Sequence, residues 1–188
     1  MTCDEPGQDE IVRWVRASQA GDKTAFDRLL QLYQHQAVRA ALGVLGNLDD
    51  AAEVVQDAFI KGYLQIGRLM YPGRFRFWIL KIVVNEAISR RRGLRRRTTR
   101  MKLFARAGFG KRSVPSDERE HTRDLRAAVA QAMAQLTDRE AQAISLFGLD
   151  GLSQDEVAQM MGCSAEAVRW HVYRARQKLR SLLSEYLE

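Results

Sequence analysis

The chain has 188 residues, with three histidines and two cysteines, and carries a formal net charge of +7. A chain of this length folds as one large domain or two small ones. Two cysteines far apart in sequence give neither a disulfide framework nor a paired-cysteine metal site. No carboxylate pair with a nearby histidine, no glycine-rich phosphate loop and no metal-ligand spacing appears. We therefore predict no catalytic residue, no metal and no cofactor.

The positive charge is concentrated in one segment. Between Glu86 and Asp117 the sequence has eleven arginines and lysines and no acidic residue, so the rest of the chain is net negative. Such basic blocks often act as nucleic-acid-binding arms. The first residues are acidic rather than apolar, and no apolar run approaches the about 20 residues of a membrane span. We expect a protein of a reducing cytoplasm with a polyanionic partner and no membrane insertion.

The first half of the chain predicts a compact all-helical bundle. Apolar residues at helical spacing indicate helices over 9–20 and 22–46, and a third that begins at the acidic cap Asp49 and Asp50. The third helix has two faces: Val55 and Phe59 point to the core, and an acidic side carries an isoleucine. A solvated acidic face is the ordinary interpretation, but the isoleucine favours docking of a basic protein partner. The residues of this face are Asp49, Glu53, Gln56, Asp57 and Ile60.

An apolar loop over 67–73 comes next, and because apolar residues are costly in an exposed loop, it either packs down or meets a ligand. It is followed by a helix that begins aromatic and ends basic. Rings that receive bases and cations that hold phosphates are what single-stranded nucleic acid requires. Packing of the aromatic residues in the core fits the same spacing. We expect one face of this helix to pack in the core and another to bind nucleic acid. Asn85 either reads an unpaired base or ties the loop to the helix. The candidate residues are Leu69, Tyr71, Arg76, Trp78, Lys81, Asn85, Arg90 and Arg91.

Helical spacing fails from Gly93 to about Thr122, which predicts a flexible basic linker. The expected organisation is all-α, with two small helical domains over 1–94 and 123–188 joined by a linker over 95–122.

The second domain predicts a helix-turn-helix. Ser153 and Glu156 form a capping box, Gly162 can end that helix in the left-handed conformation, and Ser164 can cap a longer cationic helix. An ordinary helical hairpin with a solvated basic face is the alternative. The turn and the density of arginines beyond it favour a helix that enters the major groove. The expected duplex-reading residues are Ser164, Arg169, Trp170, Tyr173, Arg174 and Arg176.

Taken together, several of these segments carry a family resemblance. They are the acidic helix 49–61, Phe75-x-x-Trp78 followed by Asn85 and the arginine run, and the segments 136–140 and 168–179. In this order they resemble the extracytoplasmic-function (ECF) sigma factors of bacterial RNA polymerase.

The resemblance implies a bacterial cytoplasmic protein that has no enzymatic activity. It would bind the clamp helices and flap of core RNA polymerase, and its expected regulator is an anti-sigma factor. The second domain would read the minus-thirty-five duplex, and the first would melt and read the minus-ten element. Trp170 and Phe147 depart from the family pattern, which predicts an unusual minus-thirty-five preference and the loss of one phosphate contact.

Two other classes compete with this interpretation. A stand-alone helix-turn-helix regulator would bind an operator unaided, but it leaves the acidic-apolar helix without a role. An enzyme acting on nucleic acid lacks the required constellation of side chains.

Overall fold

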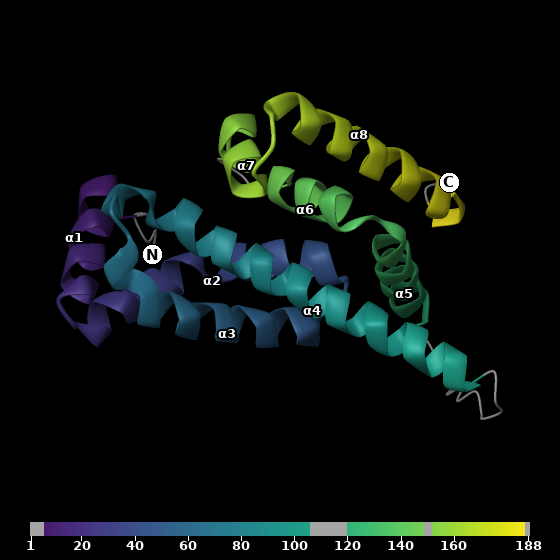
Figure 1. The fold of residues 1–188 in the computed structure, drawn as a ribbon, viewed down its shortest axis with the longest axis horizontal. Coiled ribbons are helices and arrows are strands. Elements are labelled where there is room, and N and C mark those ends of the chain that lie inside the picture. Colours follow the sequence, from purple (N-terminus) through teal and green to yellow (C-terminus); the bar gives the residue numbers. More distant parts are fainter. Residues whose placement is uncertain (1–5, 106–119, 149–151, 187–188) are drawn as a thin grey trace.

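The computed structural model describes residues 6–105, 120–148 and 152–186, and the elements within these ranges are helical (Figure 1). The α-helices are α1 (Gln8–Gln19), α2 (Lys23–Leu45), α3 (Leu48–Gln65), α4 (Phe75–Ala105), α5 (Glu120–Gln135), α6 (Asp138–Phe147), α7 (Gln154–Met161) and α8 (Ala165–Leu182), with short 3-10 turns at Ile66–Arg68, Pro72–Arg74 and Ser184–Tyr186.

Helices α2, α3 and α4 form a bundle, and α1 packs across one end of it (Figure 1). Asp22 caps α2 by accepting hydrogen bonds from the backbone N–H groups of Thr24 and Ala25. Gly46 ends α2 with a φ of 72°, in the left-handed region that favours glycine. The cap of α3 differs from the expected acidic pair, because the Asn47 side chain accepts from the Asp50 N–H.

Aromatic rings fill the centre of this bundle. Phe26 meets Phe59, Tyr63 and Phe75 edge to face, with ring centroids 5.2–6.3 Å apart. Gly62 lets α3 approach α4, because a Cβ at this position would lie 2.6 Å from Ile79 Cδ1. A side chain at position 62 would therefore require the end of the Ile79 side chain to shift.

Helices α7 and α8 form the predicted helix-turn-helix, and α6 packs against both of them. Ser153 and Glu156 make the capping box at α7, and Gly162 ends α7 with a φ of 62°. Ser164 then caps α8 by accepting from the Ala167 N–H at 3.2 Å. A second capping box, at Thr137, begins α6. These caps are local contacts, which is why the sequence predicts them.

Helix α4 is longer than expected. It continues through Gly93 to Ala105, whereas the helical spacing in the sequence fails near Gly93. One glycine inside a helix costs only about 1 kcal/mol, and the surrounding arginines are good helix formers. Part of the predicted linker, 106–119, lies outside the described residues.

The two helical bodies pack against one another. One continuous apolar core contains residues of α2, α3 and α4 together with Leu146, Val157, Met160 and Met161. Helix α6 lies against α2, where a Cβ on Gly43 would meet Ser145 Oγ at 2.5 Å. The sequence predicts two bodies on a linker but not their contact. None of the described helices is long and apolar enough to cross a membrane.

Candidate nucleic-acid and protein interfaces

The outer face of α8 carries exposed aromatic and cationic side chains. Trp170 is 56% exposed and Tyr173 is 60% exposed. The Arg174 guanidinium carbon stands 5.6 Å from the centroid of the Trp170 ring, a cation–π contact. Arg169 donates to Gln154 Oε1 at 3.3 Å and thereby reaches back to α7. Four of the predicted duplex-reading residues therefore share one solvent-facing surface, while the Ser164 hydroxyl serves as the helix cap.

Arg176 lies elsewhere on α8. Its guanidinium carbon stands 5.3 Å over the ring of Phe147, at the end of α6. Phe147 is the apolar residue from which the sequence analysis predicted the loss of a phosphate contact. The cation of Arg176 lies beside it. Behind this face, His171 packs edge to face on Trp170, with ring centroids 5.0 Å apart. Burial, and then the nearby Arg139, lower the pKa of His171 below its usual value, so the imidazole is neutral near pH 7.

The loop between α3 and α4 is held down by glutamines of α1. Gln19 Nε2 donates to the carbonyls of Ile66 and Leu69 at 3.0 and 2.9 Å, and Gln8 Nε2 donates to the Gly73 carbonyl at 2.7 Å. The Leu69 side chain is buried in the core. The loop therefore folds Leu69 inward in this conformation, which is the packed-down alternative of the sequence analysis and leaves this side chain off the surface.

The tip of the same loop faces solvent. Met70 is 82% exposed and Tyr71 is 67% exposed, so both side chains are accessible to a ligand. On α4, Trp78 is half-buried with its ring centroid 5.9 Å from that of Phe75. Arg76 donates to Gln36 Oε1 at 2.9 Å, and Lys81 is exposed. The aromatic start of α4 is therefore mainly core, and its cations lie at the surface.

Asn85 lies ten positions beyond the start of α4 and so does not tie the loop to the helix. It is exposed and lines a cleft of about 320 Å³ between α4 and the helix-turn-helix. The other residues that line this cleft are Ile88, Ser89, Arg92, Asp138, Arg139, Gln142, Met160 and Met161.

The arginines after Asn85 are engaged within the chain. Arg90 bridges to α3, with its Nη2 2.9 Å from Asp50 Oδ1 and 2.6 Å from Glu53 Oε2. Arg91 is only 5% exposed and contacts the second body. Arg91 therefore cannot touch nucleic acid in this conformation, contrary to the expectation, while Arg90 remains at the surface.

The predicted acidic-apolar face of α3 is exposed. Asp49, Glu53, Gln56 and Asp57 face solvent, and Ile60 is 55% exposed. Sequence reasoning missed the apolar groove beside it, a hollow of about 520 Å³ between α2 and α3. Leu64, one helical turn beyond Ile60, is its most exposed apolar member, and that spacing was the available signal. Other residues that line the groove include Leu30, Gln34, Val38, Ala52 and Tyr63.

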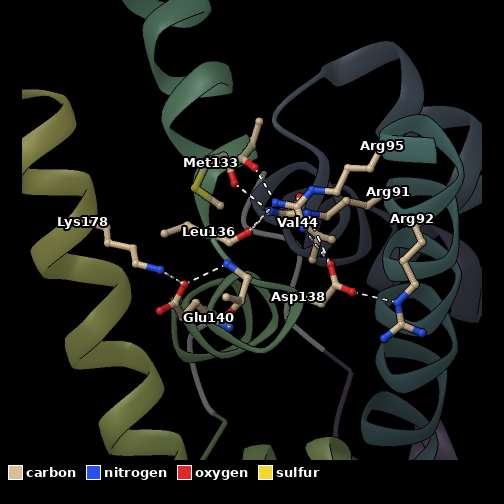
Figure 2. A network of polar contacts seen from close by, with 11 residues as sticks. Val44, Arg91, Arg92, Arg95, Met133, Leu136, Asp138, Glu140 and Lys178 are labelled. Atoms are coloured by element: carbon tan, nitrogen blue, oxygen red, sulfur yellow. Dashed lines mark hydrogen bonds and ion pairs between the residues drawn. The ribbon is translucent and has the colours of Figure 1, made fainter. Parts of the chain in front are cut away.

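The sequence analysis also did not predict the polar network between the two bodies. Arg92, Arg95 and Asp138 take part in it with Arg91, as Figure 2 shows. The three arginines belong to a basic run that reads as a nucleic-acid arm. In the sequence, Asp138 belongs to the start of a helix. Neither the arginine run nor this helix start therefore predicts that the arginines and Asp138 contact one another. Within the described part of the chain, no group of three or more metal-ligating side chains lies close enough to hold a metal ion.

These features define a helix-turn-helix protein whose other helical body, α1–α4, carries its own surface of exposed loop and cationic residues. Family models match both bodies: Sigma-70 region 2 matches residues 29–97, and Sigma-70 region 4 matches residues 126–179.

Similar proteins are known over nearly the whole chain. The RNA polymerase sigma-H factor of Pseudomonas aeruginosa is 30% identical over 187 residues, covering 96% of this chain and 97% of that protein. The ECF RNA polymerase sigma-E factor of Haemophilus influenzae is 31% identical over 172 residues, covering 88% and 90%. Among solved structures, CnrH in complex with the cytosolic domain of CnrY aligns with a TM-score of 0.68 and 26% identity, over 94% of this chain and 99% of that one. The chain belongs to the ECF sigma factors of bacterial RNA polymerase.

Proposed function

We propose that this chain binds core RNA polymerase and directs it to promoters, docking through α3 and reading DNA through α4 and α8. The observation that carries the proposal is that α3 and α8, which carry exposed surfaces of different chemistry, lie on opposite sides of the molecule (Figure 1). The α3 face is acidic with an apolar centre, and the α8 face is cationic and aromatic. A protein bound on α3 therefore leaves α8 free for DNA.

The α3 face suits a basic protein surface such as the clamp helices of the polymerase. Protein interfaces combine an apolar centre with a polar rim. Here Ile60 supplies the centre, beside the groove that also contains Leu64, and Asp49 and Asp57 supply part of the rim. Gln56 adds an amide that can donate and accept hydrogen bonds. The second body would meet the polymerase flap.

The α8 face suits the major groove of the minus-thirty-five element. Its first turns carry Arg169, Trp170 and Tyr173, where side chains of a recognition helix reach base edges. Arg169 is placed to bind a guanine, and Arg174 to bind a phosphate. Trp170 brings a large apolar ring to the same surface, which favours contact with a thymine methyl group.

The loop tip and α4 suit the melted minus-ten strand. Met70 and Tyr71 are exposed apolar side chains next to the basic helix, and Lys81 and Asn85 face solvent along it. Extruding a base from the duplex costs a few kcal/mol, and stacking and hydrogen bonds to the protein must offset this cost. Tyr71 offers the ring for stacking, and Asn85 the amide for reading a base edge.

The proposal includes no enzymatic activity and a place of work in the bacterial cytoplasm, where polymerase and promoter DNA are found. An anti-sigma factor is the proposed regulator. The solved structure of CnrH with the cytosolic domain of CnrY supports this, since that protein shares the fold and holds a protein partner.

Size-exclusion chromatography of the chain with purified core polymerase tests the docking. We expect co-elution at equimolar ratio and no shift of duplex DNA by the chain alone. A stand-alone helix-turn-helix regulator would elute apart from the polymerase and would bind a specific duplex unaided.

A further inference from the structure

Trp170 carries the largest side chain on the exposed face of α8, and it lies where a recognition helix meets base edges. It belongs to the second turn of α8, and it is 56% exposed. Tyr173 and Arg174, three and four positions further along, share its face because residues at these spacings are neighbours on a helix. Trp170 and Tyr173 therefore form an exposed aromatic patch, and such a patch on a soluble protein marks a binding surface.

Two neighbours fix the orientation of the Trp170 ring. The Arg174 guanidinium carbon lies 5.6 Å from the ring centroid. His171 meets the indole with an angle of 72° between the ring planes and 5.0 Å between the centroids, which is the edge-to-face arrangement that aromatic pairs prefer. Adjacent residues of a helix normally point in different directions. The contact with His171 therefore holds the indole in one direction along the surface of α8.

His171 is the anchored side of this contact. The imidazole is half-buried, and Arg139 and Glu140 of α6 lie near enough to affect its pKa. Its Nδ1 atom is buried and makes no hydrogen bond within the described residues, so packing rather than a hydrogen bond at that atom holds the ring. Arg174, by contrast, is exposed on a long flexible stem. His171 therefore positions the Trp170 ring, and the Arg174 charge stays available for a phosphate.

The thymine methyl is the group in the major groove that matches an oriented indole ring. The other groups that distinguish base pairs there are hydrogen-bond donors and acceptors, whereas the methyl is apolar. An apolar contact depends on close approach, so a ring held in one orientation favours one base position. The indole Nε1–H can also donate to a phosphate, but such a contact carries no sequence information.

We propose that Trp170 is a specificity-determining residue that reads the methyl group of one thymine in the minus-thirty-five element, and that His171 is the positioning residue that holds its ring for this contact. Arg169 reads its base separately, since its side chain is tied to Gln154 of α7 and not to the indole. This inference rests on the proposed reading of the minus-thirty-five duplex by α8.

Replacing thymine by deoxyuridine tests the methyl contact, because the two bases pair alike and differ only in that methyl group. The complex of the chain with core polymerase is first used to select a minus-thirty-five duplex from random sequence. Each thymine of the selected element, on either strand, is then replaced singly by deoxyuridine. The measured quantity is the ratio of the affinities for the thymine and deoxyuridine duplexes at each position.

We expect one position at which the unsubstituted chain prefers thymine about fourfold, which corresponds to the burial of one methyl group. Trp170→Ala should abolish the preference at that position and at no other. Trp170→Phe should retain most of it, since a phenyl ring also contacts a methyl group. Arg169→Ala should lower the affinity for the selected element and leave this ratio unchanged.

His171→Ala should also abolish the thymine preference at that position, and His171→Phe should restore it because an aromatic ring again packs against the indole. His35→Ala, an exposed histidine of α2, is the matched control and should keep the preference. A histidine with only a structural role would change the affinity for both duplexes equally, and that result overturns the positioning role. Should His171→Ala melt below the assay temperature, His171→Leu takes its place.

Equal binding of the thymine and deoxyuridine duplexes at every position by the unsubstituted chain overturns the methyl contact. A preference that survives Trp170→Ala overturns it as well, because another residue then reads the methyl. Equal weakening of both duplexes by Trp170→Ala assigns the indole to a phosphate and has the same consequence. If the complex with polymerase selects no duplex at all, the proposed function itself is contradicted and this inference falls with it.

Discussion

Glu140 and Lys178 form an ion pair, Nζ to Oε2 at 2.7 Å, that joins the start of α6 to the middle of α8. The Glu140 side chain is only 4% exposed, and the same oxygen accepts from the Thr137 N–H at 2.8 Å (Figure 2). The carboxylate that completes the α6 capping box therefore also fixes the recognition helix. The orientation of the DNA-reading face depends on this pair.

Removing the Glu140 charge should weaken the helix-turn-helix and make it less sensitive to acid. Burial alone would raise the pKa of Glu140, but hydrogen bonds from Lys178 and Thr137 outweigh it and lower that pKa below 4.5. A lowered pKa in the folded state stabilises the fold above the unfolded-state pKa, and this contribution is lost as pH falls through the folded value. Breaking a buried pair costs about 3–5 kcal/mol, and the one-third exposure of Lys178 reduces our expectation to about 2 kcal/mol.

Denaturant unfolding of Glu140→Gln and of the unsubstituted chain between pH 3 and pH 7 measures this effect. We expect the free energy of unfolding of the variant to be lower by about 2 kcal/mol at neutral pH, and the difference to vanish in acid. Glu156→Gln, at the exposed capping box of α7, is the control. An equal loss of stability at all pH values for Glu140→Gln would contradict the assigned pKa shift.

Local structure was predictable from the sequence, and contacts between distant segments were not. Gly162 and Ser164 act where the sequence predicts them because a cap depends on residues only a few positions apart. The sequence left open whether the loop of Leu69 packs down or meets a ligand, and nothing near Leu69 indicates that Gln19, fifty positions earlier, holds the loop inward. Arg91 belongs to a run of arginines whose members look alike in sequence, yet one is buried against carbonyls.

Asp57→Arg should abolish binding to core polymerase while the chain stays folded. Asp57 is exposed on the α3 face, so the substitution alters no internal contact but places like charge against a basic partner. The loss of one charged partner at a buried interface costs about 2–5 kcal/mol. Pull-down with core polymerase measures it, with Asp27→Arg on the exposed side of α2 as control. Unchanged binding by Asp57→Arg would remove α3 from the interface.

Arg169→Ala should relax minus-thirty-five selectivity, and Arg174→Ala should lower affinity for all sequences alike. A bidentate arginine–guanine contact is worth about 1–3 kcal/mol of discrimination, whereas a phosphate contact carries no sequence information. Competition between cognate and scrambled duplexes for the chain bound to polymerase separates the two effects. Base reading by Arg169 is excluded if its substitution weakens both duplexes equally.

Asn85→Ala should prevent promoter opening and erase preference among single-stranded minus-ten oligonucleotides, with thermal stability and polymerase binding intact. Its amide is exposed on α4, so no core contact is lost. Ser89→Ala, one turn further along the same cleft, is the control. Permanganate footprinting reports opening. If Asn85→Ala instead melts at a lower temperature and keeps its preference, Asn85 has a structural role.

The most direct test of the proposed function is transcription from fragmented genomic DNA by purified core polymerase, with the chain present or absent, followed by mapping of RNA 5′ ends. The account predicts start sites that appear only with the chain, share two upstream elements at constant spacing and disappear with Asp57→Arg. The same start sites with and without the chain, or none in either case, would contradict it.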